Sequence, residues 1–190
     1  MPLKSIDYNA DTDSELIIYP AAIKDTRGLG EVLAYSFYDF PDYLGWIYPL
    51  VQFTISEDLR YRLRTASPVY CCLVASLSNL QEELAIAGTV EITLRASGFW
   101  SNNIQYPYIS NLAVKEKYRR QGIGSQLLHK CEQIALYWGY QEIRLHVLER
   151  NDSAKQLYAH NGYQICQVEP SWGQFCFDNS PRLLLKKTLE

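Results

Sequence analysis

The sequence predicts a single domain built around a mixed α/β sheet, and three patterns lead to that fold class. Strand-like and helix-like runs alternate through the second half of the chain. Residues 89–94 alternate polar and apolar side chains, as a half-buried strand does. Residues 123–138 place their apolar side chains on one helical stripe. A chain of 190 residues, 47% of them hydrophobic, can bury one ordinary core, so we expect one domain over residues 1–190.

The first half of the chain is predicted to open with a strand and two helices and to continue into a hairpin. Pro20 closes the opening strand, and Asp25 or Thr26 is a suitable N-cap for the helix that follows. Two β-rich runs then flank a short polar turn, which is the pattern of a hairpin. The expected elements are a strand over 15–19, helices over 26–38 and 47–64, and strands over 69–77 and 84–95.

The second half is predicted to alternate strands with helices around a glycine-rich turn. Its clearest element is the helix after Gly122, which carries the apolar stripe and meets a stop signal at Gly139. Gly162 likewise ends a shorter helix that Asn151 or Asp152 can cap. The expected elements are strands over 105–114, 142–148, 163–168 and 182–189, and helices over 123–138 and 151–161. The sheet is therefore expected to have about seven strands, flanked by about four helices.

Charge and hydropathy exclude several classes of partner. The formal net charge is -3 and the pI is near 5.7, whereas electrostatic binding of nucleic acid needs clustered excess Lys and Arg. The most apolar stretch, residues 43–51, is far shorter than the roughly 20 residues of a membrane-spanning helix. Residues 1–14 lack the apolar core of a secretory signal and are expected to be a mobile lead-in. We therefore expect no nucleic-acid partner and no membrane partner.

The five cysteines indicate a reducing compartment and no metal. They include the adjacent pair Cys71 and Cys72, and they show neither the C-x-x-C spacing nor the neighbouring histidine pair of structural zinc sites. Their odd number also argues against a complete set of disulfides. We therefore expect a cytoplasmic protein without a metal cofactor.

The turn that joins strand 105–114 to the following helix has the features of a phosphate site. Backbone N–H groups at the start of a helix lie at its positive end and have no intrahelical partner, so they bind phosphate oxygens. Glycine allows a close approach, and Arg119 and Arg120 add attraction. A nucleoside-triphosphate loop would need Lys after its last glycine, where this chain has Ser125 after Gly124. A dinucleotide fingerprint would need a small residue at position 127, which is Leu127.

Two motifs in the right order resemble the GNAT superfamily of N-acetyltransferases. The first is Arg119-x-x-Gly122-x-Gly124, which follows the strand Tyr108-Ile109-Ser110-Asn111-Leu112-Ala113-Val114. The second is the segment from Asn151 to Tyr163, which matches N-x-x-A-x-x-L-Y-x-x-x-G-F/Y. The resemblance covers residues 105–165, and it implies acetyl-CoA as the acyl donor. It also implies a central sheet that is splayed in the middle and admits the pantetheine arm between strands 108–114 and 142–148.

The resemblance assigns residues to the binding of acetyl-CoA. It implies that the backbone N–H of Leu112 polarises the acetyl carbonyl and that Tyr158 is the general acid for the coenzyme A sulfur. The residues expected to contact acetyl-CoA are Leu112, Ala113, Val114, Arg119, Arg120, Gln121, Gly122, Ile123, Gly124, Ser125, Asn151, Ser153 and Tyr158.

Two sets of residues compete for the role of general base. His146 lies on a strand opposite its most apolar face, and an unperturbed histidine titrates near pH ~6.5, which suits proton uptake at neutral pH. Together with Tyr108 it resembles the pair with which some protein N-terminal acetyltransferases deprotonate the amine through water. Glu91 is the alternative, because other GNAT branches place a glutamate on the central strands; it could equally be a solvated strand-face carboxylate.

The acceptor is expected to be a primary amine, with the protein N-terminal α-amine first and the lysine side chain second. An α-amine with a pKa near ~8 is partly neutral at pH 7, whereas a lysine near ~10.4 is not, so a histidine base suits an N-terminus. The strand opening Y-I-S-N-L-A-V also resembles plastid and cyanobacterial GNAT enzymes. Aromatic residues over 37–48 and the loop 172–175 are expected to flank the acceptor mouth. The alternatives are a small-molecule amine acetyltransferase for a polyamine, amino acid or antibiotic, and a silent acetyl-CoA-binding module.

Overall fold

Seven strands form one mixed sheet in the computed structural model, which describes residues 15–38, 40–65, 67–78, 84–96, 105–170 and 180–190. The sheet order is β1-β2-β3-β4-β5-β7-β6. Every neighbouring pair is antiparallel except β4 and β5, which are parallel. The strands are β1 (Glu15–Pro20), β2 (Tyr70–Ser78), β3 (Leu84–Ala96), β4 (Gln105–Val114), β5 (Glu142–Leu148), β6 (Gln164–Glu169) and β7 (Arg182–Thr188). The predicted fold class is confirmed.

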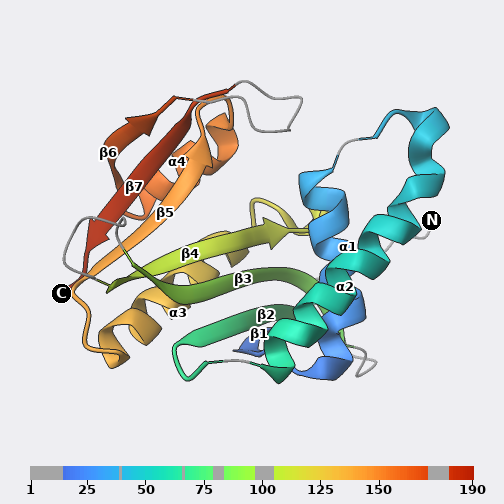
Figure 1. The fold of residues 1–190 in the computed structure, drawn as a ribbon, viewed down its shortest axis with the longest axis horizontal. Helices are drawn as coiled ribbons and strands as arrows, with labels where there is room; N and C mark the ends of the chain where they lie inside the picture. Colours follow the sequence, from blue (N-terminus) through green and yellow to red (C-terminus); the bar gives the residue numbers. More distant parts are fainter. Residues whose placement is uncertain (1–14, 39, 66, 79–83, 97–104, 171–179) are drawn as a thin grey trace, which may run out of the picture.

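The sheet is splayed at its parallel pair. Strands β4 and β5 are in register at two positions only, Tyr108 with Arg144 and Ile109 with Leu145. Beyond Ile109 the two strands separate, and Figure 1 shows β5, β7 and β6 swinging away from the layer that β1 to β4 form. The splay expected from the resemblance is therefore present, and residues 110–114 have no β5 partner on that edge.

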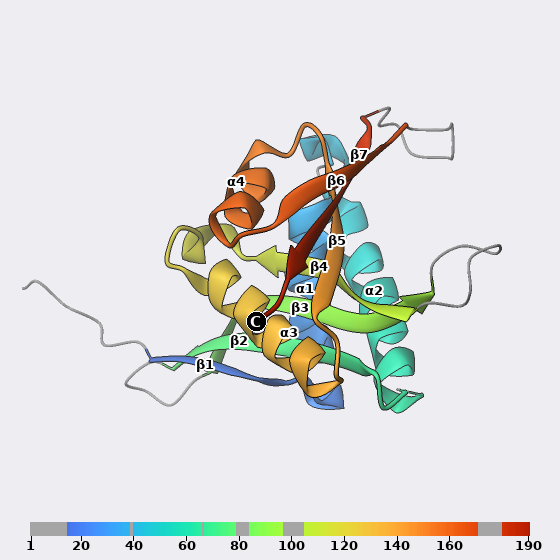
Figure 2. The same ribbon diagram turned by 90° about the vertical axis from the view of Figure 1, so that its left-hand side faces the viewer.

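Four α-helices cover the sheet on both faces. Helix α3 (Ile123–Tyr137) packs its apolar stripe on one face, and Figure 2 shows α4 (Asp152–His160) on the same side. Helices α1 (Thr26–Phe37) and α2 (Tyr48–Arg64) cover the opposite face of β2 to β4. The core therefore has two parts, one beneath α3 and α4 and one beneath α1 and α2.

Short 3-10 helices complete the described residues. The segment Asp42–Ile47, within the aromatic run, is one of them, and Glu116–Tyr118 after β4 is another. Helix α2 consequently begins at Tyr48, with proline in its first turn. No helix of the described ranges is long and apolar enough to cross a membrane.

Helices α1 and α2 cross closely at a glycine. A Cβ atom added at Gly30 would lie 2.8 Å from the backbone oxygen of Gln52 and would also collide with the Ser56 hydroxyl, which donates to that same oxygen at 2.7 Å. The backbone atom cannot yield as a flexible side chain would. The crossing therefore depends on the missing side chain at Gly30.

Gly30→Ala should lower the free energy of unfolding by about 1–3 kcal/mol, because the added methyl group forces α1 away from α2. Urea unfolding followed by circular dichroism measures the change. Gly45→Ala is the matched control, since a Cβ at Gly45 meets nothing within 4 Å. Equal unfolding midpoints for the two variants would show that the crossing tolerates a side chain.

Candidate active site

A cavity of about 820 Å³ lies beside the part of β4 that has no β5 partner. Of the residues predicted to contact acetyl-CoA, all but Gln121 line it; Gln121 is exposed on the turn instead. The sequence analysis missed Ser36, Tyr118, Ala154, Gln156, Leu157 and His160 as lining residues. Positions on α4 one turn from Tyr158 could have been found by extending the helical periodicity. Ser36 could not, because only the tertiary packing of α1 brings it there.

Strand β4 carries a bulge beside this cavity. Asn111 has a left-handed φ of 53°, and the register with β3 shifts between Thr89 and Glu91. Thr89 pairs with Ala113 whereas Glu91 pairs with Ser110, so β4 accommodates one extra residue there. Asparagine tolerates this conformation better than most residues. An asparagine inside an otherwise apolar strand was the available sequence signal for the bulge.

The turn after β4 is built as a phosphate site requires. Arg120 and Gly122 have φ values of 65° and 78°, and α3 begins at the next residue, Ile123. The unpaired N–H groups of the first turn of α3 therefore face the cavity that Ile123 and Gly124 line. Arg119 ties the turn to the strand, because its Nε donates to the Val114 carbonyl at 3.1 Å.

Helix α4 presents Tyr158 to the same cavity. The Asn151 side chain caps the helix by accepting from the Ala154 N–H at 3.1 Å. Tyr158 is buried, and this burial, followed by charge repulsion with Tyr108, raises its pKa to about 12. Its hydroxyl has no hydrogen-bond partner among the described residues. A protonated phenol without a partner is free to donate to a ligand in the cavity.

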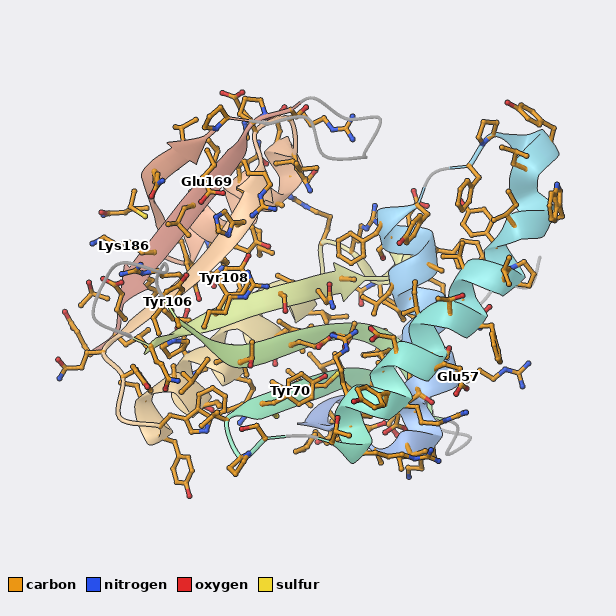
Figure 3. All side chains as sticks on the ribbon, in the orientation of Figure 1. Glu57, Tyr70, Tyr106, Tyr108, Glu169 and Lys186 are labelled. Atoms are coloured by element: carbon orange, nitrogen blue, oxygen red, sulfur yellow. The ribbon has the colours of Figure 1, made fainter. Side chains whose placement is uncertain are left out.

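A second group of side chains lies where the strands diverge. The Tyr108 hydroxyl is 2.8 Å from His146 Nδ1, and His146 Nε2 lies 3.2 Å from Glu169 Oε1. Figure 3 labels Tyr108 and Glu169. Strands β4, β5 and β6 supply one member each. Neither Tyr108 nor His146 lines the cavity, although Tyr108 is near enough to affect Tyr158. Glu169 was not predicted, because only the β6–β7 pairing brings it to His146.

The surroundings of His146 set its protonation. Burial lowers its pKa below the ordinary value of 6.5, and the Glu169 carboxylate partly opposes this effect. The cations of Arg182 on β7 and Arg95 on β3 lower the pKa further. Arg95 also lies 3.5 Å over the Tyr108 ring. His146 is therefore neutral at pH 7, and with its proton on Nε2 facing Glu169, Nδ1 accepts from the Tyr108 hydroxyl.

Glu91 is in a different situation. Only 2% of it is exposed, so it is no solvated strand-face carboxylate. Its Oε2 accepts from Arg62 Nη1 at 2.5 Å and from the Tyr70 hydroxyl at 2.8 Å. Its Oε1 accepts from Asn111 Nδ2 at 2.7 Å. Both oxygens are thus engaged by the protein, and Glu91 does not line the cavity.

The predicted acceptor mouth is described only in part. Phe37 lines the cavity, and Tyr43 and Trp46 are 78% and 72% exposed on the 3-10 helix before α2. Phe40 packs edge-on against Tyr48, which joins this segment to α2. The loop 172–175 lies outside the described residues.

The family follows from a direct comparison. The model of the acetyltransferase (GNAT) family matches residues 28–163, which is most of the described fold. The chain belongs to the GNAT family. The match includes both motifs, the diverging strands and the residues that line the cavity. Among the described residues no group of His, Cys, Asp and Glu could hold a metal ion.

Two relatives of known name each match about two thirds or more of this chain. "GCN5-related N-acetyltransferase 10, chloroplastic" from Arabidopsis thaliana is 28% identical over 72% of this chain, which spans only 56% of that protein. "Thialysine N-epsilon-acetyltransferase" from Bos taurus is 34% identical over 67% of this chain and 75% of its own length.

Solved structures share the fold. A chain from the NatC complex bound to Gag peptide and CoA superposes with a TM-score of 0.69 at 16% identity, covering 93% of this chain and 99% of that one. The PaiA N-acetyltransferase from Thermoplasma acidophilum in complex with coenzyme A superposes with a TM-score of 0.65 at 21% identity, covering 92% and 99%.

Nuclear magnetic resonance titration of the His146 ring should give a midpoint below 6.5, and Glu169→Gln should lower it further. The carboxylate favours the imidazolium, so its loss favours the neutral ring. Glu142→Gln is the control, because Glu142 pairs with Arg144 and Lys186 instead. A midpoint that rises in Glu169→Gln would contradict the arrangement.

Proposed function

We propose that the protein transfers the acetyl group of acetyl-CoA directly to a primary amine in a ternary complex, with protein N-terminal α-amines as the main acceptors and lysine side chains as secondary ones. The observation that carries the proposal is the cavity beside the free part of β4. Its lining includes the glycine turn before α3, Tyr158 and residues 112–114 of β4, which have no β5 partner.

The acyl donor would be held by backbone and side-chain groups that line this cavity. The first N–H groups of α3, with Arg119 and Arg120 nearby, suit the pyrophosphate. The free edge of β4 at residues 112–114 suits the amides of the pantetheine arm, which can pair with it as a strand would. The Leu112 N–H would polarise the acetyl carbonyl and stabilise the oxyanion.

The transfer requires one bond to form and one to break. The neutral amine attacks the thioester carbonyl, a tetrahedral intermediate forms, and the C–S bond breaks. The thiolate that leaves would take its proton from the Tyr158 hydroxyl, which is protonated at neutral pH because of its raised pKa. The proton lost by the amine would pass to the Tyr108–His146 pair.

The geometry favours this pair over Glu91 as the base. His146 Nδ1 accepts from Tyr108, so the phenol oxygen keeps lone pairs for an amine or a bridging water. Glu91 would have to give up hydrogen bonds from Arg62, Tyr70 or Asn111 before it could accept a proton. Glu169 would act through His146 as a positioning residue.

The proposed acceptor class rests on the base and on the fold. A neutral histidine base suits an amine whose own pKa is near ~8. The NatC chain of similar fold comes from a complex that holds a peptide with CoA. A small amine is the second candidate, because a relative 34% identical to this chain is named for thialysine. A cytoplasmic location remains a prediction, and curated relatives are named chloroplastic.

Tyr158→Phe should lower turnover by about a hundredfold and leave the Kd for acetyl-CoA nearly unchanged, because the ring stays and only the acid is lost. Steady-state kinetics and calorimetry separate the two effects. Tyr163→Phe is the control. Tyr163 packs edge-on against Tyr158 but does not line the cavity, and the substitution removes only its hydroxyl. Equal turnover in Tyr158→Phe would remove the acid role.

His146→Ala should lower kcat/KM most below pH 8, by about a hundredfold at pH 7, and recover partly at higher pH. The base must be neutral, so wild-type activity should fall only below a midpoint that lies under 6.5. The variant depends instead on the fraction of acceptor already neutral, which rises with pH. A loss of the same size at every pH would argue against a base at this position.

Labelled acetyl-CoA tested against a peptide array and a panel of small amines should give preferential acetylation of peptide α-amines. Higher kcat/KM for a polyamine, an amino acid or thialysine would favour the small-molecule alternative. Normal acetyl-CoA binding with background transfer to every acceptor would indicate a silent binding module.

A further inference from the structure

We propose that Glu91 is a positioning residue that holds the β4 bulge through Asn111, and that it is not the base. The inference rests on the proposed acetyl transfer, because the bulge includes the Leu112 backbone assigned to the acetyl carbonyl. The structure joins four observations that no assigned role uses: a buried carboxylate, three donors to it, a left-handed asparagine and a shift in strand register.

The bulge needs a brace because its backbone conformation is unfavourable. A non-glycine residue with φ near +53° is less stable than one in the ordinary backbone regions. The Asn111 side chain offsets this by donating to Glu91 at 2.7 Å, across to the neighbouring strand β3. A charged acceptor strengthens such a bond, and burial excludes competing water.

Glu91 is itself fixed from the other side. Arg62 of α2 and Tyr70 of β2 donate to its second oxygen, and Arg62 also pairs with Asp58 at 2.5 Å. Figure 3 shows Tyr70 on the sheet beneath α2. We call this chain of contacts the brace: Arg62 of α2 holds Glu91 of β3, and Glu91 holds Asn111 in the bulge of β4. It connects helix α2 to the strand beside the cavity. With hydrogen bonds to both of its oxygens, the Glu91 carboxylate holds the bulge in place and does not transfer a proton.

The direction of the Leu112 N–H follows from the bulge. The extra residue of β4 at this point reverses which backbone groups face β3 and which face the gap toward β5. If the Asn111 side chain is released, residues 111–113 can relax toward a regular strand, and the donor moves from its place. Displacements of about 1 Å at such a donor cost up to about a hundredfold in rate.

Four variants test the brace: Glu91→Gln, Asn111→Ala, their double variant, and Asn111→Gly. In Glu91→Gln the side chain has one oxygen, which cannot accept from both Arg62 and Asn111. Asn111→Ala removes the Asn111 donor itself. We expect each to lower kcat about tenfold to a hundredfold, with little change in KM for acetyl-CoA and no shift in the acidic limb of the pH–rate profile. The double variant should lose no more than the worse single variant, because both break one contact.

Comparing Asn111→Gly with Asn111→Ala shows whether activity depends on the backbone conformation of residue 111 or only on its side chain. Asn111→Gly adopts a φ near +53° without strain, so it should retain more activity than Asn111→Ala. Glu57→Gln is the control, since Glu57 is a carboxylate whose partner is Arg60 and which does not line the cavity. Figure 3 shows Glu57 on α2. It should leave kcat unchanged.

Two results would overturn the brace. One is a Glu91→Gln enzyme that loses the acidic limb while Asn111→Ala behaves as the wild type, which would make Glu91 the base. The other is additive losses in the double variant. Hydrogen exchange without any substrate gives a separate readout, with faster exchange at residues 111–113 expected in Glu91→Gln and Asn111→Ala. A wild type that acetylates no amine would defeat the proposed function, while the exchange data would still decide the brace.

Discussion

The site depends on a sheet that stays continuous at one end of a parallel strand pair and opens at the other. Backbone N–H and C=O groups inside a protein need partners, and β5 supplies none to the edge of β4 after Ile109. Strand β5 pairs with β7 along its whole length but with β4 only at Arg144 and Leu145, so residues 110–114 of β4 have no strand partner on that side. A ligand with amide groups can take the place of the missing strand.

Groups of different chemistry lie in the cavity and at the point where the two strands diverge. The turn into α3 contributes backbone donors, α4 contributes Tyr158, and the point of separation holds the Tyr108–His146 pair. Burial then acts in opposite directions on two of these side chains, because it raises the pKa of the Tyr158 phenol and lowers that of the His146 imidazole. Burial therefore keeps the Tyr158 phenol protonated and the His146 imidazole neutral at pH 7.

Sequence patterns predicted those features of the fold and the site that depend on residues close together in the chain. The apolar stripe of α3, the glycine turn before it and the Asn151 cap can each be recognised within a few residues, and the cavity lining agrees with the motif except at Gln121. Glu91 shows the limit of such patterns. Strand alternation gives its face correctly, but its three donors come from α2, β2 and β4, and only the packed fold brings them together. Glu169 was missed for the same reason.

A crystal structure of the protein with coenzyme A bound tests the role of the splayed sheet most directly. The pyrophosphate should lie against the backbone N–H groups of residues 120–124, and the pantetheine amides should pair with the edge of β4 at residues 112–114. Coenzyme A bound on another surface, or strands β4 and β5 closed upon each other with the ligand outside, would contradict the account.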